Sequence, residues 1–441
     1  MRLSENQTEV LMNDPKQKLL FSVEHLFDIK PLKNFEVLFD TLAPFVPKEH
    51  SHNKVGRPKI SRLSLLSALI YKNLRGLLTL SDLVSDLASN PSLALRCGFG
   101  IGEPTPTKET FSTFLRDTPH QFFEIIRESM VLELIKLKEL KAAFVSIDSS
   151  PIKANARENN LKTTSADRFN KHKILKSDKD ARLGVTIIHN PNELFSRRVQ
   201  YFWGYRSHVV SDALTELPIT EKTLPANIHD SKVCIPLLKE LIELGISPQG
   251  VIGDAAFDSQ EILGFIVNDV KARPYIPRNP RHKISAFPAS ATGQRLCIAG
   301  LPMRNWGKFR DDKNRLRRKF VCPIKYSKAI AQQFPTCPMS HPNFSKPQGC
   351  TAYLRIDTDI RKNIDYDSPQ FKKVYNLRTS AERVFSRVIT LSLRNIPVKG
   401  LDATANYVTI AHISTLLVAL TAIKTGNKDK IRYFKSLVKE L

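Results

Sequence analysis

The stretch Gly253-Asp254-Ala255-Ala256-Phe257-Asp258-Ser259 decides the fold that we predict for this chain. The largely apolar residues 246–252 before it predict a buried strand, which delivers Asp254 to its carboxyl end. Asp258, the expected N-cap, then opens a helix that continues through Ile266. A carboxylate at the end of a buried strand is costly unless a metal ion or a proton shares its charge. The chemistry of this chain therefore depends on which other carboxylates meet Asp254.

The net charge of the chain indicates its kind of partner. Lys and Arg number 67 against 43 Asp and Glu, which gives a formal net charge of +24 over 441 residues. This excess predicts a polyanion, most simply nucleic acid, as the binding partner. A basic protein with no more than a solvated surface is the alternative. The length allows two or three domains and a large core.

Cysteine spacing and hydropathy predict the compartment. The six cysteines are scattered and lack the dense framework of a secreted disulfide protein, so a reducing interior is expected. Residues 1–17 lack the apolar segment of a signal peptide. The longest uncharged run, residues 407–423, carries Thr, Ser and His, so residues 405–424 are expected to form a buried helix and not a membrane span.

The first third of the chain is expected to be helical. After an irregular or partly helical lead-in over residues 1–53, apolar spacing predicts short helices within residues 54–140. Thr79, Asn90-Pro91 and Thr107 are expected to begin three of them. Tight turns between short helices fit a helix-turn-helix-like DNA-binding domain, and a plain helical bundle fits them equally.

Residues 141–270 are expected to form the first part of an α/β core. Asp148 closes the first predicted strand, and a polar loop is expected over residues 156–182. The strands are predicted over residues 142–148, 183–188, 194–203, 205–210, 217–224 and 251–254.

Several polar residues of this part have a structural interpretation. Tyr205, Arg206 and His208 lie on a predicted strand with alternating sides, where a structural role is favoured over an approach to a site. His229-Asp230 is expected to cap the helix that follows, because His would be an unusual ligand for a hard cation.

Residues 271–365 are expected to form a basic inserted subdomain of strands and loops. Residues 271–319 carry 14 Lys and Arg against two acids, so half of the chain's excess positive charge lies there. Tyr275, Phe287, Trp306 and Phe309 are interleaved with these basic residues. Such interleaving suits neutralisation of a nucleic-acid backbone with some stacking on bases.

The same region contains candidate ligands for a structural zinc ion, namely Cys322, Cys337, His341 and Cys350. Their spacing lacks the paired Cys-x-x-Cys knuckles of a well-marked zinc site. Ordinary thiols are therefore the alternative.

Residues 366–426 are expected to complete the core, followed by a basic tail over residues 427–441. Apolar periodicity predicts a helix from Tyr375 to Ser392. Tyr375, Arg378 and Glu382 would share one face of that helix. An exposed helix with an ordinary Glu–Arg pair is the alternative.

Three carboxylates thus stand in distinctive positions: Asp148, Asp254 and Glu382. Hard oxygen ligands on rigid elements suit Mg²⁺ or Mn²⁺. Two such ions about 4 Å apart can activate an attacking oxygen and stabilise a leaving one. Phosphodiester chemistry would join these carboxylates to the basic surface, although a single strand-end Asp is more often a turn residue.

Several segments together resemble the transposases of bacterial insertion sequences. More specifically, they are similar to the DDE branch, which has an RNase H-like α/β fold with a mixed sheet flanked by helices and an insertion before the glutamate. The N-terminal residues 54–91 resemble the helical domain that precedes this core. The other segments are SIDSSPIKANA (146–156), DKDARLGV (178–185), GYRSHVVSDALTELPI (204–219), LPANIHDS (224–231), VIGDAAFDSQE (251–261), NWGKFRDDKNRLRRKFVCP (305–323) and YNLRTSAERVFSRV (375–388).

The resemblance implies roles for particular residues. Asp148, on the first strand of the core, Asp254, on the fourth, and Glu382 would be the three acids that hold two Mg²⁺ ions, with Mn²⁺ as a substitute. Tyr375 and Arg378 would contact DNA near the cut. The family's helix carries a Lys after these residues, where this chain has Ile389. Arg387 is near in sequence but, at five residues from Glu382, would point elsewhere on the helix.

The resemblance also implies a function. The chain would bind terminal inverted repeats, hydrolyse phosphodiester bonds at the element ends and join the 3′-hydroxyl to target DNA. It would act as a homodimer on double-stranded DNA, without a membrane, in the bacterial cytoplasm at the nucleoid. The alternative is a transposase-derived DNA-binding protein that does not cut DNA. The missing Lys favours this alternative. A structure-selective nuclease of the same fold, which would not join strands, is a third hypothesis.

Overall fold

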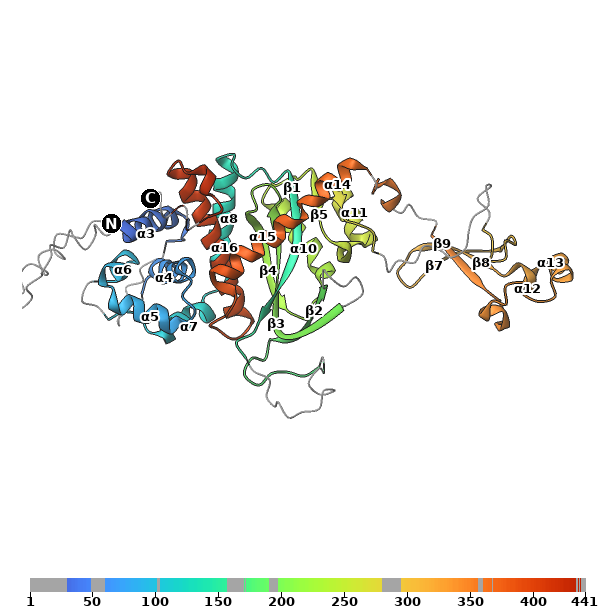
Figure 1. Ribbon diagram of the computed structural model, residues 1–441, viewed down its shortest axis with the longest axis horizontal. Coiled ribbons are helices and arrows are strands. Elements are labelled where there is room, and N and C mark those ends of the chain that lie inside the picture. Colours follow the sequence, from blue (N-terminus) through green and yellow to red (C-terminus); the bar gives the residue numbers. More distant parts are fainter. Residues whose placement is uncertain are drawn as a thin grey trace, which may run out of the picture.

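A mixed six-stranded sheet forms the centre of the molecule, as the computed structural model in Figure 1 shows. Along the sheet the strands follow the order β2-β3-β1-β5-β6, and β4 pairs with β3. The strands are β1 (Phe144–Lys153), β2 (Arg182–His189), β3 (Arg197–Asp212), β4 (Pro218–Pro225), β5 (Gly250–Ile252) and β6 (Arg273–Tyr275). The structure describes residues 30–48, 60–100, 104–156, 170, 172–189, 197–279, 295–355, 360–366, 368–433, 435 and 437.

Strand β1 is the junction between the two halves of this sheet. It pairs antiparallel with β3 over its length from Val145 and parallel with β5 over residues 144–146. The prediction that a strand closes at Asp148 is wrong, because hydrogen bonds to β3 extend β1 to Lys153. Asp148 therefore lies inside β1, just beyond the end of its pairing with β5. The resemblance placed Asp254 on the fourth strand of the core. In the structure β2 is an additional strand beside the first half of β3, so β5, which precedes Asp254, is the fifth strand in chain order.

Strand β3 is a single strand of 16 residues where two were predicted. Its first half pairs with β2, and its second half pairs with β1 on one side and β4 on the other. Gly204 lies where these pairings meet, and a Cβ atom there would stand 2.0 Å from the carbonyl oxygen of Ile152. Only glycine permits the two backbones to come so close. The predicted turn at Asn190-Pro191 lies outside the described residues.

We expect Gly204→Ala to lower the free energy of unfolding by roughly 1–3 kcal/mol, because the added methyl group must push β1 and β3 apart. Gly264→Ala is the matched control, since Gly264 lies in a helix and its nearest atom to a new Cβ would be 3.6 Å away. Alanine favours helices by about 1 kcal/mol over glycine, so the control should be neutral or stabilising. Urea unfolding of both variants checks this, and equal effects would contradict it.

Helices cover the sheet, and the helical segments from Pro369 to Leu393 follow one another without a break. The predicted helix over residues 375–392 is not uniform, because its turns change from α to 3₁₀ at Asn376–Arg378 and to π at Ile389–Leu393. The helices are α10 (Asp230–Glu243), α11 (Gln260–Asn268), α14 (Pro369–Tyr375), α15 (Thr379–Val388) and α16 (Leu401–Lys424), with 3₁₀ turns at Ala255–Phe257, Ile360–Asn363 and Lys428–Lys430.

The N-terminal helices share one hydrophobic cluster with the sheet. Helix α16 runs between the two parts, and the ammonium group of the buried Lys72 donates 2.8 Å to the Tyr407 hydroxyl. Thr79 and Thr107 cap their helices as predicted, and Asn90 caps the third. The helices are α3 (Lys30–Leu42), α4 (Arg62–Arg75), α5 (Leu80–Ser89), α6 (Pro91–Arg96), α7 (Lys108–Asp117) and α8 (His120–Lys136), with a 3₁₀ turn at Ala43–Phe45.

Helix α16 is the one helix of the described residues that is long and apolar enough to cross a membrane, with a mean hydropathy of 1.5 in its most apolar window. In this structure 94% of that window is buried inside the protein. Several of its polar residues have partners there, such as Asn406, whose amide donates to the carbonyl groups of Leu115 and Thr118. The predicted buried helix is thus present, and it begins four residues earlier than expected.

A separate three-stranded antiparallel sheet stands apart from the main body, at the end opposite the N-terminal helices (Figure 1). It has a small core of its own, built around Phe320 and three cysteines. Its elements are β7 (Arg304–Arg310), β8 (Leu316–Val321), α12 (Pro323–Tyr326), α13 (Lys328–Gln333), a 3₁₀ turn at Pro342–Ser345 and β9 (Thr351–Arg355). Strand β6, which was predicted within this inserted segment, is instead an edge strand of the main sheet.

Candidate active site

Asp148 and Asp254 lie at the same level of two neighbouring parallel strands. The register pairs Ser146 of β1 with Ile252 of β5, and each aspartate comes two residues later. Asp254 immediately precedes a 3₁₀ turn and accepts a hydrogen bond of 2.8 Å from the backbone N–H of Ala256. The Asp148 carboxylate accepts one of 2.8 Å from the N–H of Ser149. The carboxyl ends of adjacent parallel strands therefore bring together two acids that are 106 positions apart.

Burial and nearby negative charge raise the pKa of both carboxyl groups. Burial, with a contribution from Asp254, raises the pKa of Asp148 to about 6, against the hydrogen bond from Ser149. Burial also raises the pKa of Asp254, and the charge of Asp230 adds to the effect. Arg378 lowers both pKa values but does not offset the other causes. A site of this kind favours a bound cation or a proton.

Arg378 connects this pair to the third predicted acid. Its guanidinium group forms an ion pair of 2.8 Å with Glu382, whose side chain is 53% exposed. Burial lowers the pKa of Arg378, but Glu382, Tyr375 and Asp148 together raise it above its usual range. Tyr375 is half-buried, and its ring stacks on Phe371 with 6.0 Å between centroids and an angle of 18°. Tyr375 and Glu382 thus both lie beside Arg378, which is in electrostatic range of Asp148 and Asp254.

The donor chemistry of Asp148 and Asp254 fits Mg²⁺. This ion binds through one or two carboxylates and keeps places for phosphate oxygens and water. Two neighbouring carboxylates with raised pKa values would gain from such a cation. Within the described part of the chain, no group of three or more His, Cys, Asp or Glu side chains is arranged to hold a metal ion. Glu382 accordingly contacts Arg378 in this structure.

Arg387 does not take the place of the Lys that the family's helix carries. Its guanidinium group donates 2.6 Å to the Glu216 carboxylate and 2.7 Å to the Glu216 carbonyl oxygen. Ile389, at the position where Lys was expected, is the first residue of the π-helical turn and packs partly buried against the core. The prediction that Arg387 points elsewhere on the helix is confirmed, because it lies against the β3–β4 turn.

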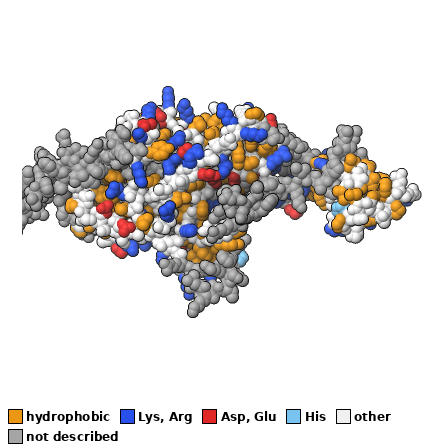
Figure 2. Space-filling view, viewed as in Figure 1, with side chains coloured by type: hydrophobic (Ala, Val, Ile, Leu, Met, Phe, Trp, Pro, Cys, Tyr) orange, Lys and Arg blue, Asp and Glu red, His pale blue; other side chains and the backbone are white. Residues whose placement is uncertain are grey.

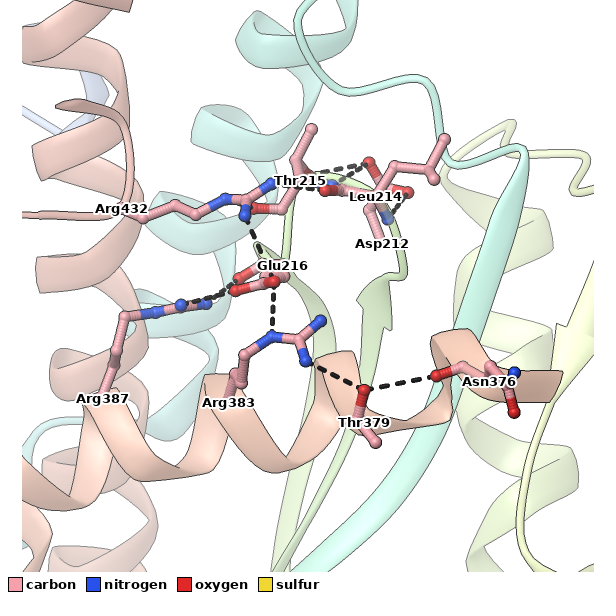
Figure 3. Close-up of polar contacts among 9 residues, drawn as sticks. All are labelled: Asp212, Leu214, Thr215, Glu216, Asn376, Thr379, Arg383, Arg387 and Arg432. Carbon is pink, nitrogen blue, oxygen red and sulfur yellow. Dashed lines mark hydrogen bonds and ion pairs between the residues drawn. The ribbon is translucent and has the colours of Figure 1, made fainter. Parts of the chain in front are cut away.

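Glu216 is a centre of contacts that sequence reasoning missed (Figure 3). It lies in the turn between β3 and β4, and its side chain is only 6% exposed. Three arginines from two distant segments, Arg383 and Arg387 of α15 and Arg432 after α16, bind its carboxylate at 2.6, 2.6 and 3.2 Å. Burial would raise the pKa of Glu216, but the hydrogen bonds from Arg387 and Arg383 keep it below its usual value. Glu216 therefore ties the helix that carries Glu382 to the sheet.

The other polar residues of the core have mixed outcomes. His229 is the N-cap of α10 as predicted. Asp258 is not the N-cap of α11, because Ser259 caps that helix while the buried Asp258 binds Arg361 at 2.6 Å. Tyr205 has the structural role predicted for it, since its buried hydroxyl donates 2.6 Å to Asp178. Arg206 and His208 instead face Asp230, a fourth acid near the site.

The inserted sheet exposes aromatic and basic side chains. Every residue of β7 is exposed, and the rings of Phe309 and Tyr353 lie 5.7 Å apart across the sheet. Trp306, 48% exposed, packs against Tyr326. Tyr275 does not belong to this surface, because it is buried in the main sheet, and Phe287 lies outside the described residues. Lys and Arg also spread over the main body in Figure 2.

The predicted zinc ligands are not assembled in the described structure. Cys322 and Cys350 are buried together in the core of the inserted sheet, and their neighbour there is Cys297. Burial and the nearby Cys322 raise the pKa of Cys350 to about 12, so its thiol is protonated at neutral pH. Cys337 lies apart from this core and accepts a long hydrogen bond of 3.5 Å from the N–H of His341. The alternative of ordinary thiols describes this arrangement better.

Comparison with known proteins follows the two parts of the chain. Residues 141–417 match the family described as "Transposase DDE domain", and residues 12–117 match "Transposase domain (DUF772)". No curated protein matches the chain. Among solved structures, a piggyBac transposase synaptic complex with hairpin DNA aligns with 93% of this chain and 78% of that chain, at 12% identity and a TM-score of 0.36, a likeness too small to bear on fold or function.

The first match covers more than half of the chain and includes both strand-end aspartates and Glu382. It confirms the predicted resemblance and the predicted α/β fold, whose mixed sheet is flanked by helices. The second match covers helices α3 to α7, which precede the sheet. The chain belongs to the transposases with a DDE domain, a family typical of bacterial insertion sequences, and its core has the RNase H-like fold of that family.

Proposed function

We propose that this transposase binds the terminal inverted repeats of its element as a homodimer, hydrolyses phosphodiester bonds at the element ends and joins the freed 3′-hydroxyl to target DNA. The observation that carries the proposal is the pair Asp148 and Asp254, which lie level with each other just beyond the pairing of β1 with β5. Arg378, the ion-pair partner of Glu382, lies in electrostatic range of both. Carboxylates crowded at one edge of a sheet suit phosphodiester chemistry on a polyanion.

The three acids Asp148, Asp254 and Glu382 would hold Mg²⁺, or Mn²⁺ in its place. When bound, these ions polarise the phosphate and favour ionisation of the attacking oxygen. In the hydrolytic step the oxygen of water bonds to phosphorus while the bond from phosphorus to the 3′-oxygen breaks, which leaves a 3′-hydroxyl and a 5′-phosphate. In the joining step this 3′-hydroxyl oxygen attacks a target phosphodiester, and the target's own 3′-oxygen leaves.

Other residues of the chain would hold the DNA. Arg378 presents a guanidinium group suited to phosphate, and the half-buried Tyr375 ring lies beside it. The exposed strand β7 adds Arg304, Lys308 and Arg310 at a distance from the acids. The net charge of +24 favours capture of DNA by all of these surfaces. The N-terminal helices would recognise the repeats, as the resemblance implies.

The test is a supercoiled donor plasmid that carries the flanking inverted repeats, incubated with the purified chain and Mg²⁺. We expect nicked and linear products that end in a 3′-hydroxyl at the repeats, followed by joined products when target DNA is added. Intact plasmid at all Mg²⁺ and Mn²⁺ concentrations would contradict the proposal. Cleavage without joining would favour the nuclease hypothesis.

Binding to DNA without repeats should weaken steeply with salt. The logarithm of the association constant is expected to fall by about 0.9 for each phosphate neutralised, per unit of log salt concentration. Fluorescence anisotropy with a labelled duplex at several KCl concentrations measures this slope. A flat response would contradict the assignment of the basic surface to DNA.

A second candidate function has one observation in its favour. Ile389 stands where the family's helix has Lys, and Arg387 binds Glu216 and so does not replace it. A transposase-derived protein that binds DNA without cutting would fit this loss. The same plasmid separates the two functions, because the second predicts bound ends and no cleaved strand.

A further inference from the structure

Asp230 is a fourth carboxylate near the strand-end aspartates. It is the first residue of α10, directly after the N-cap His229. Its charge raises the pKa values of both Asp148 and Asp254, which places it within electrostatic range of the pair. The resemblance assigned no role to this residue, and the sequence indicated only a helix cap.

The Asp230 carboxylate accepts a hydrogen bond from one residue of the sheet and lies close to donor groups of two more. The Ser149 hydroxyl donates 2.8 Å to one oxygen, and His208 Nδ1 stands 3.4 Å from the same oxygen. The Arg206 guanidinium group lies 3.7 Å from the other oxygen and also donates 3.1 Å to Ser149 Oγ. These donors come from paired strands, since Ser149 of β1 stands opposite His208 of β3. The carboxylate therefore connects α10 to β1 and β3 at one point.

This point is next to Asp148. Ser149 follows Asp148 in β1, beyond the last residue that pairs with β5. The β5 side of β1 thus gives Asp148 no hydrogen-bonded neighbour at its own level. The contact from Asp230 to Ser149 supplies a restraint on β1 where the ladder to β5 has ended.

We propose that Asp230 is a positioning residue of the active site, which holds Ser149, and through it Asp148, level with Asp254 and adds a negative charge that favours a divalent cation there. The inference rests on the proposed function, because it concerns the same site. An acid that only capped α10 would need no donors from β1 and β3. A salt bridge that only joined α10 to the sheet would act on stability and not on the metal.

The experiment compares Asp230→Asn, Ser149→Ala and Glu243→Gln in the full chain. Glu243→Gln is the matched control, because Glu243 is exposed at the other end of the same helix and undergoes the same loss of charge. The readouts are Mn²⁺ affinity from the electron paramagnetic resonance signal of free Mn²⁺, binding of repeat DNA in EDTA, and plasmid cleavage. Residues that hold a metal ligand in place typically contribute about 10–100-fold to metal affinity or activity.

We expect Asp230→Asn to weaken Mn²⁺ binding and slow cleavage by about 10–100-fold, with unchanged DNA binding in EDTA. Ser149→Ala should weaken Mn²⁺ binding less, because the charge of Asp230 remains, and Glu243→Gln should match the unsubstituted chain. The inference is overturned if Asp230→Asn keeps its Mn²⁺ affinity, or loses DNA binding in EDTA in the same proportion. Should Asp230→Asn not fold, unchanged Mn²⁺ affinity in Ser149→Ala overturns the inference.

The Mn²⁺ measurement separates this inference from the proposed function. If the unsubstituted chain binds Mn²⁺ but cleaves no plasmid, the proposed cleavage fails. The difference in Mn²⁺ affinity between Asp230→Asn and Glu243→Gln then still decides the role of Asp230.

Discussion

Asp254→Ala should lower cleavage of the supercoiled donor plasmid by more than about 100-fold while binding of the repeats in EDTA stays intact. Loss of a residue that only supports a metal ligand usually lowers metal affinity or activity by about 10–100-fold. Loss of a metal ligand itself should lower the cleavage rate by more than that. Asp254 is in addition one of the two carboxylates that lie level with each other just beyond the pairing of β1 with β5. Removing it would leave Asp148 without the carboxylate that lies level with it, and Asp148 and Glu382 alone would hold a metal ion less tightly.

Two controls make this result specific. Asp269→Ala removes a carboxylate from an exposed position at the end of the following helix, and it should cleave like the unsubstituted chain. Asp254→Asn retains an acceptor for the N–H of Ala256, whose loss in the Ala variant costs about 1 kcal/mol. Both Asp254 variants should be inactive and should melt within a few degrees of the parent. Cleavage by Asp254→Ala at the parental rate would refute the mechanism.

Glu216→Ala should lower the free energy of unfolding by about 2–3 kcal/mol, which is less than the loss for a fully buried ion pair because water reaches its arginines. The carboxylate is almost fully buried, and its removal leaves Arg383, Arg387 and Arg432 without their shared acceptor. Thermal and urea unfolding measure the effect. Glu216→Gln should fall between Ala and the parent, since an amide oxygen accepts one of the hydrogen bonds but carries no charge.

Glu243→Ala is the control for this prediction, because Glu243 is exposed on α10. It should change stability by no more than about 0.5 kcal/mol. Glu216 also restrains α15, on which Arg383 follows Glu382 directly. We therefore expect Glu216→Ala to reduce plasmid cleavage as well. A variant that unfolds at the parental temperature would show that the three arginines contribute nothing through Glu216.

The local features of this fold could be predicted because they depend on residues close in sequence. Thr79 accepts from the backbone of Asp82, three residues later, so its cap could be predicted from the pattern. Asp254 follows a strand and precedes a turn, as the small residues after it indicate. The end of β1 could not be predicted in this way, because β3 sets it by pairing as far as Lys153. The 3₁₀ and π turns between Tyr375 and Leu393 could not be predicted either, because the apolar pattern assumes the α-helical period throughout.

In the candidate site, too, residues marked by their neighbours in sequence could be predicted, and residues with distant partners could not. Tyr375, Arg378 and Glu382 were found because they recur at helical spacing, and Arg378 and Glu382 form the pair that this spacing predicts. Asp230 and Glu216 were missed because no nearby residue marks them. The partners of Asp230 lie 22–81 residues away, and those of Glu216 lie 167–216 residues away. The zinc alternative is disfavoured for the reverse reason, since four residues near in sequence are not gathered in space in the described structure.

By itself, the sequence determined the family, the order of strands and helices around Asp254, and the excess of positive charge. These properties depend on hydrogen bonds and side-chain periods within a few residues. Only the tertiary structure decided that Asp148 lies level with Asp254, that Arg387 is committed to Glu216, and that Asp230 contacts Ser149. Strand register and through-space charge join residues far apart in the chain, and no local pattern encodes the distance between them.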